Sequence, residues 1–176
     1  GNVFGEKTFD VFLTINGIAG PLLLGTAVGT LFTGANFTVD RLNLANGAGS
    51  GSATVISQWT TPWHGLEALG DVSNVFLGIA VTFLAATLAC QYFMNNIANE
   101  TLFARARRRM LTLAAPFLVF FLTFFVWLLF SDGLAVDAAG RISAEPYKYL
   151  HNMLEMPYVA AALLIGVVSV LWSIYS

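Results

Sequence analysis

Charged residues are scarce in this chain. Only 10% of its 176 residues are Asp, Glu, Lys or Arg, whereas a soluble domain carries about 25%. Hydrophobic residues make up 57%. This composition excludes an ordinary soluble domain. We expect no nucleic-acid partner, although the net charge of −2 does not itself exclude a polyanion, because the basic residues are clustered locally.

Cysteine and histidine are almost absent. The one cysteine, Cys90, excludes an internal disulfide and a metal cage built from cysteines. The two histidines, His64 and His151, lie outside the apolar stretches, whereas a di-haem membrane cytochrome needs histidines within its spans. His64 is compatible with a metal or haem ligand and also with a hydrogen-bonding residue at the membrane surface. We expect no catalytic residue, no bound cofactor and no metal site in this chain.

Four apolar stretches account for most of the chain. Each is close to the length of about 20 residues that a helix needs to cross a hydrocarbon core of about 30 Å. They cover residues 11–32, 72–95, 111–130 and 157–175. The sequence therefore predicts an all-α fold, an integral membrane helical bundle of four transmembrane helices with short interfacial helices. We expect residues 1–176 to form a single transmembrane domain.

The ends of these stretches carry local signals. Asp71 directly precedes the second stretch and is expected to cap its N-terminus. Residues 98–110 are expected to form a helical extension at the membrane headgroups, and residues 145–157 a short interfacial helix. Pro116 is expected in the first two turns of the third span, where a missing N–H donor costs little.

Arginines are concentrated between the second and third stretches. Four of five consecutive positions there are Arg105, Arg107, Arg108 and Arg109. Short loops rich in arginine are retained on the cytoplasmic side of a membrane. We therefore expect residues 98–110 and both ends of the chain on the cytoplasmic side, with residues 35–66 and 132–156 on the other side.

The first stretch contains glycines and one amide. Gly25 and Gly29 form a GxxxG pair, which allows another helix backbone to approach closely. Asn16 is a polar side chain in the same stretch. Two interpretations of Asn16 are open: an interhelical hydrogen bond, or part of a polar or proton path.

Three blocks of sequence resemble subunit II of the cytochrome bd quinol oxidases. Residues 20–40 resemble a glycine-spaced helix with a turn and an F-x-x-D ending. Residues 63–109 resemble that subunit's next helix and its hydrophilic tail, and residues 131–136 are similar to the D-G-x-x-V turn that follows. Residues 145–157 look closest to Bacteroidetes-type forms. The matching positions include Gly25, Gly29, Gly34, Phe37, Asp40, Gly78, Asn99, Glu100, Leu102, Arg105 and Arg107.

The resemblance has two departures. The family's Asn-Pro-Phe at the start of the second helix is replaced here by residues 71–76, and the family's N-terminal helices with their acidic motifs are absent. We therefore expect this chain to be the central fragment of a longer subunit. No acidic residue of a proton route and no haem ligand carries over from the family to this chain.

The resemblance implies a role within a complex rather than a site. Such a complex is a quinol:oxygen oxidoreductase that reduces oxygen to water, with haems b and d in subunit I and quinol as the substrate. This chain would be a haem-free scaffold for subunit I, in contact with membrane lipid, and would contribute to the proton route. The expected location is the bacterial inner (cytoplasmic) membrane, as a multi-pass protein.

A second function class is open from the residues alone. A fragment of a small membrane transporter or permease would show a broken helix or ionisable groups at mid-membrane. Asn16 beside Gly17, Gly20 and Pro21 is the one place that hints at such a break. Without the resemblance, the residues do not separate this alternative from the oxidase subunit.

Overall fold

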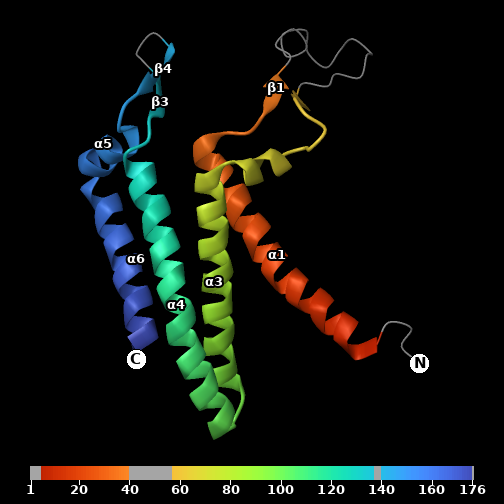
Figure 1. Ribbon diagram of the computed structural model, residues 1–176. Coiled ribbons are helices and arrows are strands. Elements are labelled where there is room, and N and C mark those ends of the chain that lie inside the picture. Colours follow the sequence, from red (N-terminus) through yellow and green to blue (C-terminus); the bar gives the residue numbers. More distant parts are fainter. Residues whose placement is uncertain (1–4, 40–56, 137–139, 176) are drawn as a thin grey trace, which may run out of the picture.

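The computed structural model of the chain describes residues 5–39, 57–136 and 140–175. Within these residues, four helices are long and apolar enough to cross a membrane. They are α1 (Gly5–Thr33), α3 (Val72–Asn96), α4 (Glu100–Leu129) and α6 (Pro157–Tyr175), as shown in Figure 1. The prediction of an all-α membrane bundle with four spans is confirmed. Asp40, one of the positions that carry the family resemblance, lies outside the described residues.

The second span begins at the predicted cap. The Asp71 carboxylate accepts a hydrogen bond from the Ser73 backbone N–H at 2.9 Å and another from the Ser73 hydroxyl at 2.5 Å. These bonds satisfy a donor that the first turn of a helix leaves without a partner. The prediction that Asp71 caps α3 is confirmed.

The third helix begins earlier than expected. Because Asn99 caps it by accepting from the Leu102 N–H at 3.0 Å, α4 starts at Glu100 and includes the arginine cluster. Alanine, leucine and arginine are strong helix formers, and nothing between the cap and the span breaks the helix. The basic segment is therefore helical, as expected, and it continues the axis of the span. The expectation for Pro116 was wrong for the same reason, because it lies in the middle of α4.

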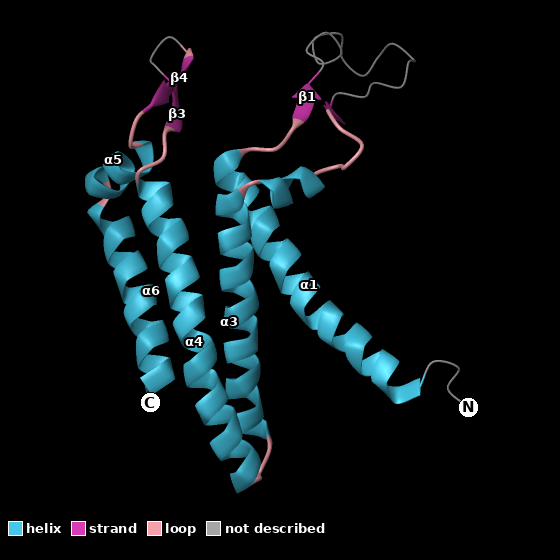
Figure 2. Cartoon of the chain, viewed as in Figure 1, coloured by secondary structure: helices cyan, strands magenta, loops and turns pink. Residues whose placement is uncertain are grey.

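In the described parts of the connections, two short β-hairpins and two short helices lie between the spans (Figure 2). Strand β1 (Phe37–Val39) pairs with β2 (Ser57–Trp59), and β3 (Gly133–Val136) pairs with β4 (Ile142–Glu145), both antiparallel. The 3₁₀ helix η2 (Leu66–Gly70) precedes α3, and α5 (Lys148–Glu155) precedes α6. A helix is thus present within residues 145–157, in shorter form than expected. The hairpins were not predicted, because strands of three or four residues are too short to show an alternating pattern.

The helices α3 and α4 form a long antiparallel hairpin (Figure 1). Leu77 of α3 is buried against Phe124 and Leu128 of α4, and Phe121 and Tyr149 pack around them. Phe117 is also buried, so part of the phenylalanine content of the third span fills a helix interface. Helix α6 lies beside α4, and none of its residues is buried. Lipid tails are as apolar as these side chains, so a membrane helix does not need to bury such surface against protein.

Helix α1 meets α3 at one end only. Its C-terminal half crosses α3, and its N-terminal half runs away from the other spans (Figure 1). Along that half, large apolar side chains are exposed, among them Phe12 at 62% and Leu13 at 69%. The position of α1 relative to the other spans therefore depends on its crossing with α3.

Candidate functional site at the crossing of α1 and α3

Three glycines allow the two backbones to approach at the crossing. A Cβ atom on Gly25 would lie 2.7 Å from Gly78 Cα and 2.9 Å from the carbonyl oxygen of Leu77. On α3, a Cβ on Gly78 would lie 2.5 Å from the Thr26 hydroxyl. Real Cβ atoms do not approach backbone this closely, so the helix separation here requires glycine on both sides. Gly29 lies one turn further along α1 and faces the Asn74 side chain, with its Cβ position 2.9 Å from Asn74 Cγ.

A buried amide joins the two helices at the same place. Asn74 is 1% exposed, and its Nδ2 atom donates a hydrogen bond to the Thr33 hydroxyl oxygen at 3.0 Å. The Thr33 hydroxyl also lies 3.4 Å from the Gly29 carbonyl oxygen. Thr26 and Thr30 instead donate to carbonyls of their own helix, Leu22 and Ala27. Asn74 was not predicted as a site residue, although it precedes Gly78 by one helical turn and so shares its face.

A polar cavity lies beside this link, at the end of α3 away from the arginine cluster. Its volume is about 140 Å³. Glu67 Oε2 accepts a hydrogen bond from the Gly65 N–H at 2.8 Å, while Oε1 is buried and has no hydrogen-bond partner among the described residues. The cavity is lined by Thr30, Thr33, Gly34, Ala35, Asn36, Gly65, Glu67, Ala68, Asp71 and Asn74.

The chemistry of this cavity follows from its lining. Hydroxyl, amide and carboxylate groups surround a volume larger than one water molecule needs, so the cavity is suited to hold water. No sequence pattern brought these groups together, because the loop, η2 and the ends of two helices each supply some of them.

Asn16 lies away from this cavity. It is exposed on the half of α1 that leaves α3, and its side chain has no hydrogen-bond partner among the described residues. An interhelical hydrogen bond to α3, α4 or α6 is therefore not formed within the described part of this chain.

The four arginines are all exposed on the first turns of α4. Arg105, Arg108 and Arg109 line an open hollow together with Thr112, whereas Arg107 is not part of this lining. The cluster lies at the end of the α3–α4 hairpin opposite to the strands (Figure 1).

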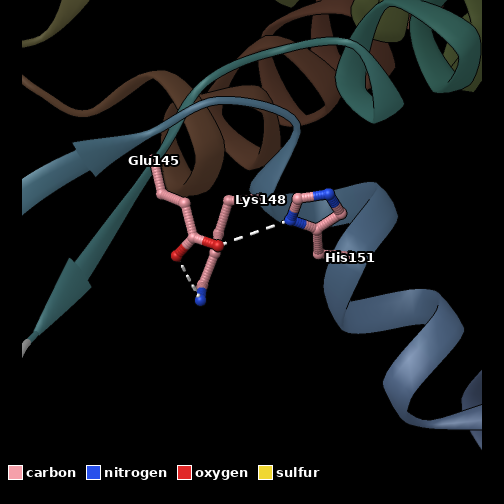
Figure 3. Close-up of polar contacts among 3 residues, drawn as sticks. All are labelled: Glu145, Lys148 and His151. Carbon is pink, nitrogen blue, oxygen red and sulfur yellow. Dashed lines mark hydrogen bonds and ion pairs between the residues drawn. The ribbon is translucent and has the colours of Figure 1, made fainter.

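The two histidines lie in separate connections outside the spans. His64 is exposed in the turn before η2, and its φ of 49° places it in the left-handed region. His151 lies on α5, with Nδ1 3.4 Å from a Glu145 carboxylate oxygen, and Lys148 Nζ lies 2.7 Å from the other oxygen (Figure 3). The hydrogen bond from Lys148 and then that from His151 lower the pKa of Glu145 below its usual value.

These positions do not fit an axial haem-ligand pair. Both histidines are exposed, and they lie in the turn before η2 and on α5 rather than at facing positions within the bundle. Among the residues that the structure describes, no group of three or more His, Cys, Asp or Glu side chains gathers closely enough to hold a metal ion.

Comparison with known proteins identifies the family. A sequence model described as cytochrome bd terminal oxidase subunit II matches residues 2–176. No curated protein and no solved structure matches the chain. The match agrees with the resemblance in the sequence blocks and gives no support to the transporter alternative. Together with the four membrane-spanning helices, it shows that this chain belongs to the cytochrome bd terminal oxidase subunit II family, and that it is a subunit of an oxidoreductase complex in a membrane.

Proposed function

We propose that this chain is a haem-free, non-catalytic scaffold of a bd-type oxidase. The complex would oxidise quinol and reduce oxygen to water, with haems b and d bound by subunit I. The observation that carries this proposal is the position of His64 and His151, both exposed and outside the spans. The spans meet instead through small residues and one buried amide, which is typical of helices that serve packing.

The proposal includes a location and an orientation. We place the chain in the bacterial inner membrane as the central part of a longer subunit, with the arginine end of α4 in the cytoplasm. Support comes from the positive-inside bias, because Arg105, Arg107, Arg108 and Arg109 all lie at one end of the bundle.

The proposal is tested on the full-length parent subunit. We would purify it from its native membrane, record the absorption spectrum and measure oxygen uptake with a quinol. We expect haem bands from a co-purifying larger subunit and quinol-driven oxygen uptake. A colourless preparation from membranes that keep their oxygen-consuming complexes intact would contradict the proposal.

The location of the haems is tested with His64→Ala and His151→Ala. If subunit I supplies the haem ligands, each variant keeps the complete haem spectrum of the wild-type complex. Loss of one haem band in either variant, with normal recovery of both subunits, would assign that haem to this chain.

Asn16 is the residue that we propose for a proton route through this chain. It is exposed on the free half of α1, where a helix of a neighbouring subunit can contact it. Thr30, at the edge of the polar cavity, lies about 21 Å further along the helix axis at 1.5 Å per residue. Asn16 and the polar cavity are therefore separate polar regions.

The test compares Asn16→Leu with Thr14→Val. Thr14 is the matched control, because it is exposed on the same part of α1 and its hydroxyl bonds back to the Asp10 carbonyl at 2.8 Å. We expect Asn16→Leu to lower quinol-driven oxygen uptake severalfold in a fully assembled complex, and Thr14→Val to leave it unchanged. Equal rates in both variants would remove Asn16 from the route.

A further inference from the structure

The arginine cluster of α4 presents three of its four guanidinium groups to one side. Arg105, Arg108, Arg109 and Thr112 follow one another at steps of three, one and three residues, which places them on one face of the helix. They line an open hollow of about 510 Å³. Arg107 lies on another face and is not part of the lining.

The positive charge of this face is not neutralised within the described part of the chain. The ion pairs found there join Glu145 to Lys148 and His151, and none involves an arginine of α4. Like charges one turn apart repel each other, so an anion bound between them is stabilising. The guanidinium group offers several N–H donors in a planar fork, which matches the oxygens of a phosphate group.

The same face continues into the membrane as an apolar line. At successive intervals of seven residues, Arg105 is followed by Thr112, Val119 and Val126. Val119 is 62% exposed and Val126 is 50% exposed. Helix α3 covers a different face of α4, and the groove between α4 and α6 is lined on α4 by Phe117, Leu118 and Phe121. An arginine hollow above an exposed apolar line therefore fits a phosphate group with acyl chains attached.

We infer that Arg105, Arg108 and Arg109 bind the phosphate of an anionic phospholipid, whose acyl chain lies along Val119 and Val126. Thr112 lines the hollow without donating, because its hydroxyl hydrogen is directed to the Arg109 carbonyl oxygen at 2.8 Å. The inference depends on α4 crossing a membrane and not on the oxidase activity. It assigns a ligand to residues that the sequence had connected only with topology.

The test measures lipid binding to the purified oxidase complex by native mass spectrometry after delipidation. Phosphatidylglycerol, phosphatidylcholine and inorganic phosphate are titrated separately. The variants are Arg108→Gln and, as the matched control, Arg107→Gln, which removes the same charge from the neighbouring position outside the hollow. Both variants change the positive-inside count equally, so topology is not a difference between them.

We expect Arg108→Gln to weaken phosphatidylglycerol binding about fivefold, because one arginine near an anionic headgroup contributes about 1 kcal/mol. Arg107→Gln should stay within about twofold of the wild type, and Arg108→Lys should restore much of the affinity. Phosphatidylcholine should bind more weakly than phosphatidylglycerol, and inorganic phosphate should not displace the lipid.

Three results would overturn the inference. Equal weakening by Arg107→Gln and Arg108→Gln would show diffuse charge rather than a site. Phosphate binding as strong as lipid binding would show that no acyl chain is recognised. Lipid binding unchanged in Arg108→Gln, with loss of the neighbouring subunit from the complex, would assign the arginines to an acidic protein segment.

Discussion

Asn74 shows how one polar side chain can fix a crossing between two apolar helices. A buried amide without a partner is costly, so Asn74 favours the arrangement in which Thr33 of α1 lies beside it. Hydrogen bonds between membrane helices contribute about 0.6–2 kcal/mol each, which is a modest but directional stabilisation. The glycines permit the approach, and the amide selects its register.

Replacing Asn74 tests this link. We expect Asn74→Ala to lower the free energy of unfolding by about 1–2 kcal/mol, because it removes the hydrogen bond to Thr33 and leaves a small void. Thr30→Ala is the control, since its hydroxyl bonds only to its own helix, and it should change stability by less than about 0.5 kcal/mol. Unfolding measured by SDS titration in mixed micelles would decide between them, and equal effects of the two variants would contradict the role of Asn74.

A double-mutant cycle gives a stricter version of the same test. Thr33→Ala should cost less when Asn74 is already alanine, because the shared hydrogen bond has gone. Strictly additive losses would mean that the 3.0 Å contact contributes nothing to stability.

Glu145 provides a pH dependence outside the spans. Its pKa is lowered by the hydrogen bonds from Lys148 and His151, so its contribution to stability is present above the pKa of the unfolded chain and is lost as the pH falls through the lowered pKa. We expect the melting-temperature difference between the wild type and Glu145→Gln to be largest near neutral pH and to disappear on acidification.

Lys148→Met is the control for this pH dependence. Removing the hydrogen bond that Lys148 donates should raise the pKa of Glu145, so that the loss of stability begins at a higher pH. Melting curves of the wild type and Glu145→Gln that remain parallel from neutral to acidic pH would argue against the effect.

At the scale of the helices, α1 is held by its C-terminal half alone. Gly25 and Gly29 face α3, whereas Cβ atoms on Gly17 and Gly20 would contact nothing within 4 Å. The glycines of α1 therefore lie in two different environments. Only Gly25 and Gly29 lie where a side chain would collide with α3. The free half remains available to a neighbouring subunit or to lipid.

Substituting one glycine of each pair separates packing from helix propensity. Gly25→Ala should destabilise the α1–α3 crossing by about 1–3 kcal/mol, because the added methyl group would meet backbone atoms that cannot rotate away. Gly17→Ala, on the same helix in open space, should be neutral or stabilising by up to about 1 kcal/mol. The measurement is again the unfolding free energy.

The leucine variants make the same comparison at the level of assembly. We expect Gly25→Leu and Gly29→Leu to reduce recovery of the assembled complex, and Gly17→Leu to serve as the control for a large side chain on α1. Normal assembly of both Gly25→Leu and Gly29→Leu would show that the crossing of α1 and α3 is not needed for assembly.

At the scale of the whole molecule, the bundle has two chemically different ends. The hairpins, η2 and α5 lie at one end, and the start of α4, which carries the arginine cluster, lies at the other (Figure 1). The polar cavity is lined by residues of η2 and of the adjoining ends of α1 and α3. This asymmetry matters because the placement of positive charge determines the orientation in which a membrane protein is inserted. The proposed orientation can be tested without purifying the complex.

Cysteine labelling in intact cells measures the orientation directly. On a Cys90→Ala background, Ala104→Cys probes the arginine end and Ala144→Cys probes β4, and both positions are exposed. We expect a membrane-impermeant maleimide added outside the cytoplasmic membrane to label the cysteine at 144, and to label the one at 104 only after permeabilisation. The reverse pattern would contradict the proposed topology, since both positions are exposed and burial does not explain a difference in labelling.

Much of the candidate site was only partly visible in the sequence. The spacing of Gly25 and Gly29 singled out a close approach, but it did not name α3 as the helix that they face. Thr33 and Asn74 are polar residues near the ends of their helices, and neither belongs to a sequence pattern that identifies it as a site residue. The two lie 41 positions apart, and no local pattern pairs residues at such a distance.

The sequence by itself determined the properties that depend on local composition. Apolar length set the four spans, Asp71 set the start of α3, and the Asn99 cap with the helix formers after it set the length of α4, because each depends on residues within a few turns of one another. Only the tertiary structure decided which face of α1 meets α3 and how Glu67 and Asp71 come to line one cavity. Those features depend on the crossing of α1 and α3, which is settled by packing between distant segments rather than by any one stretch of the chain.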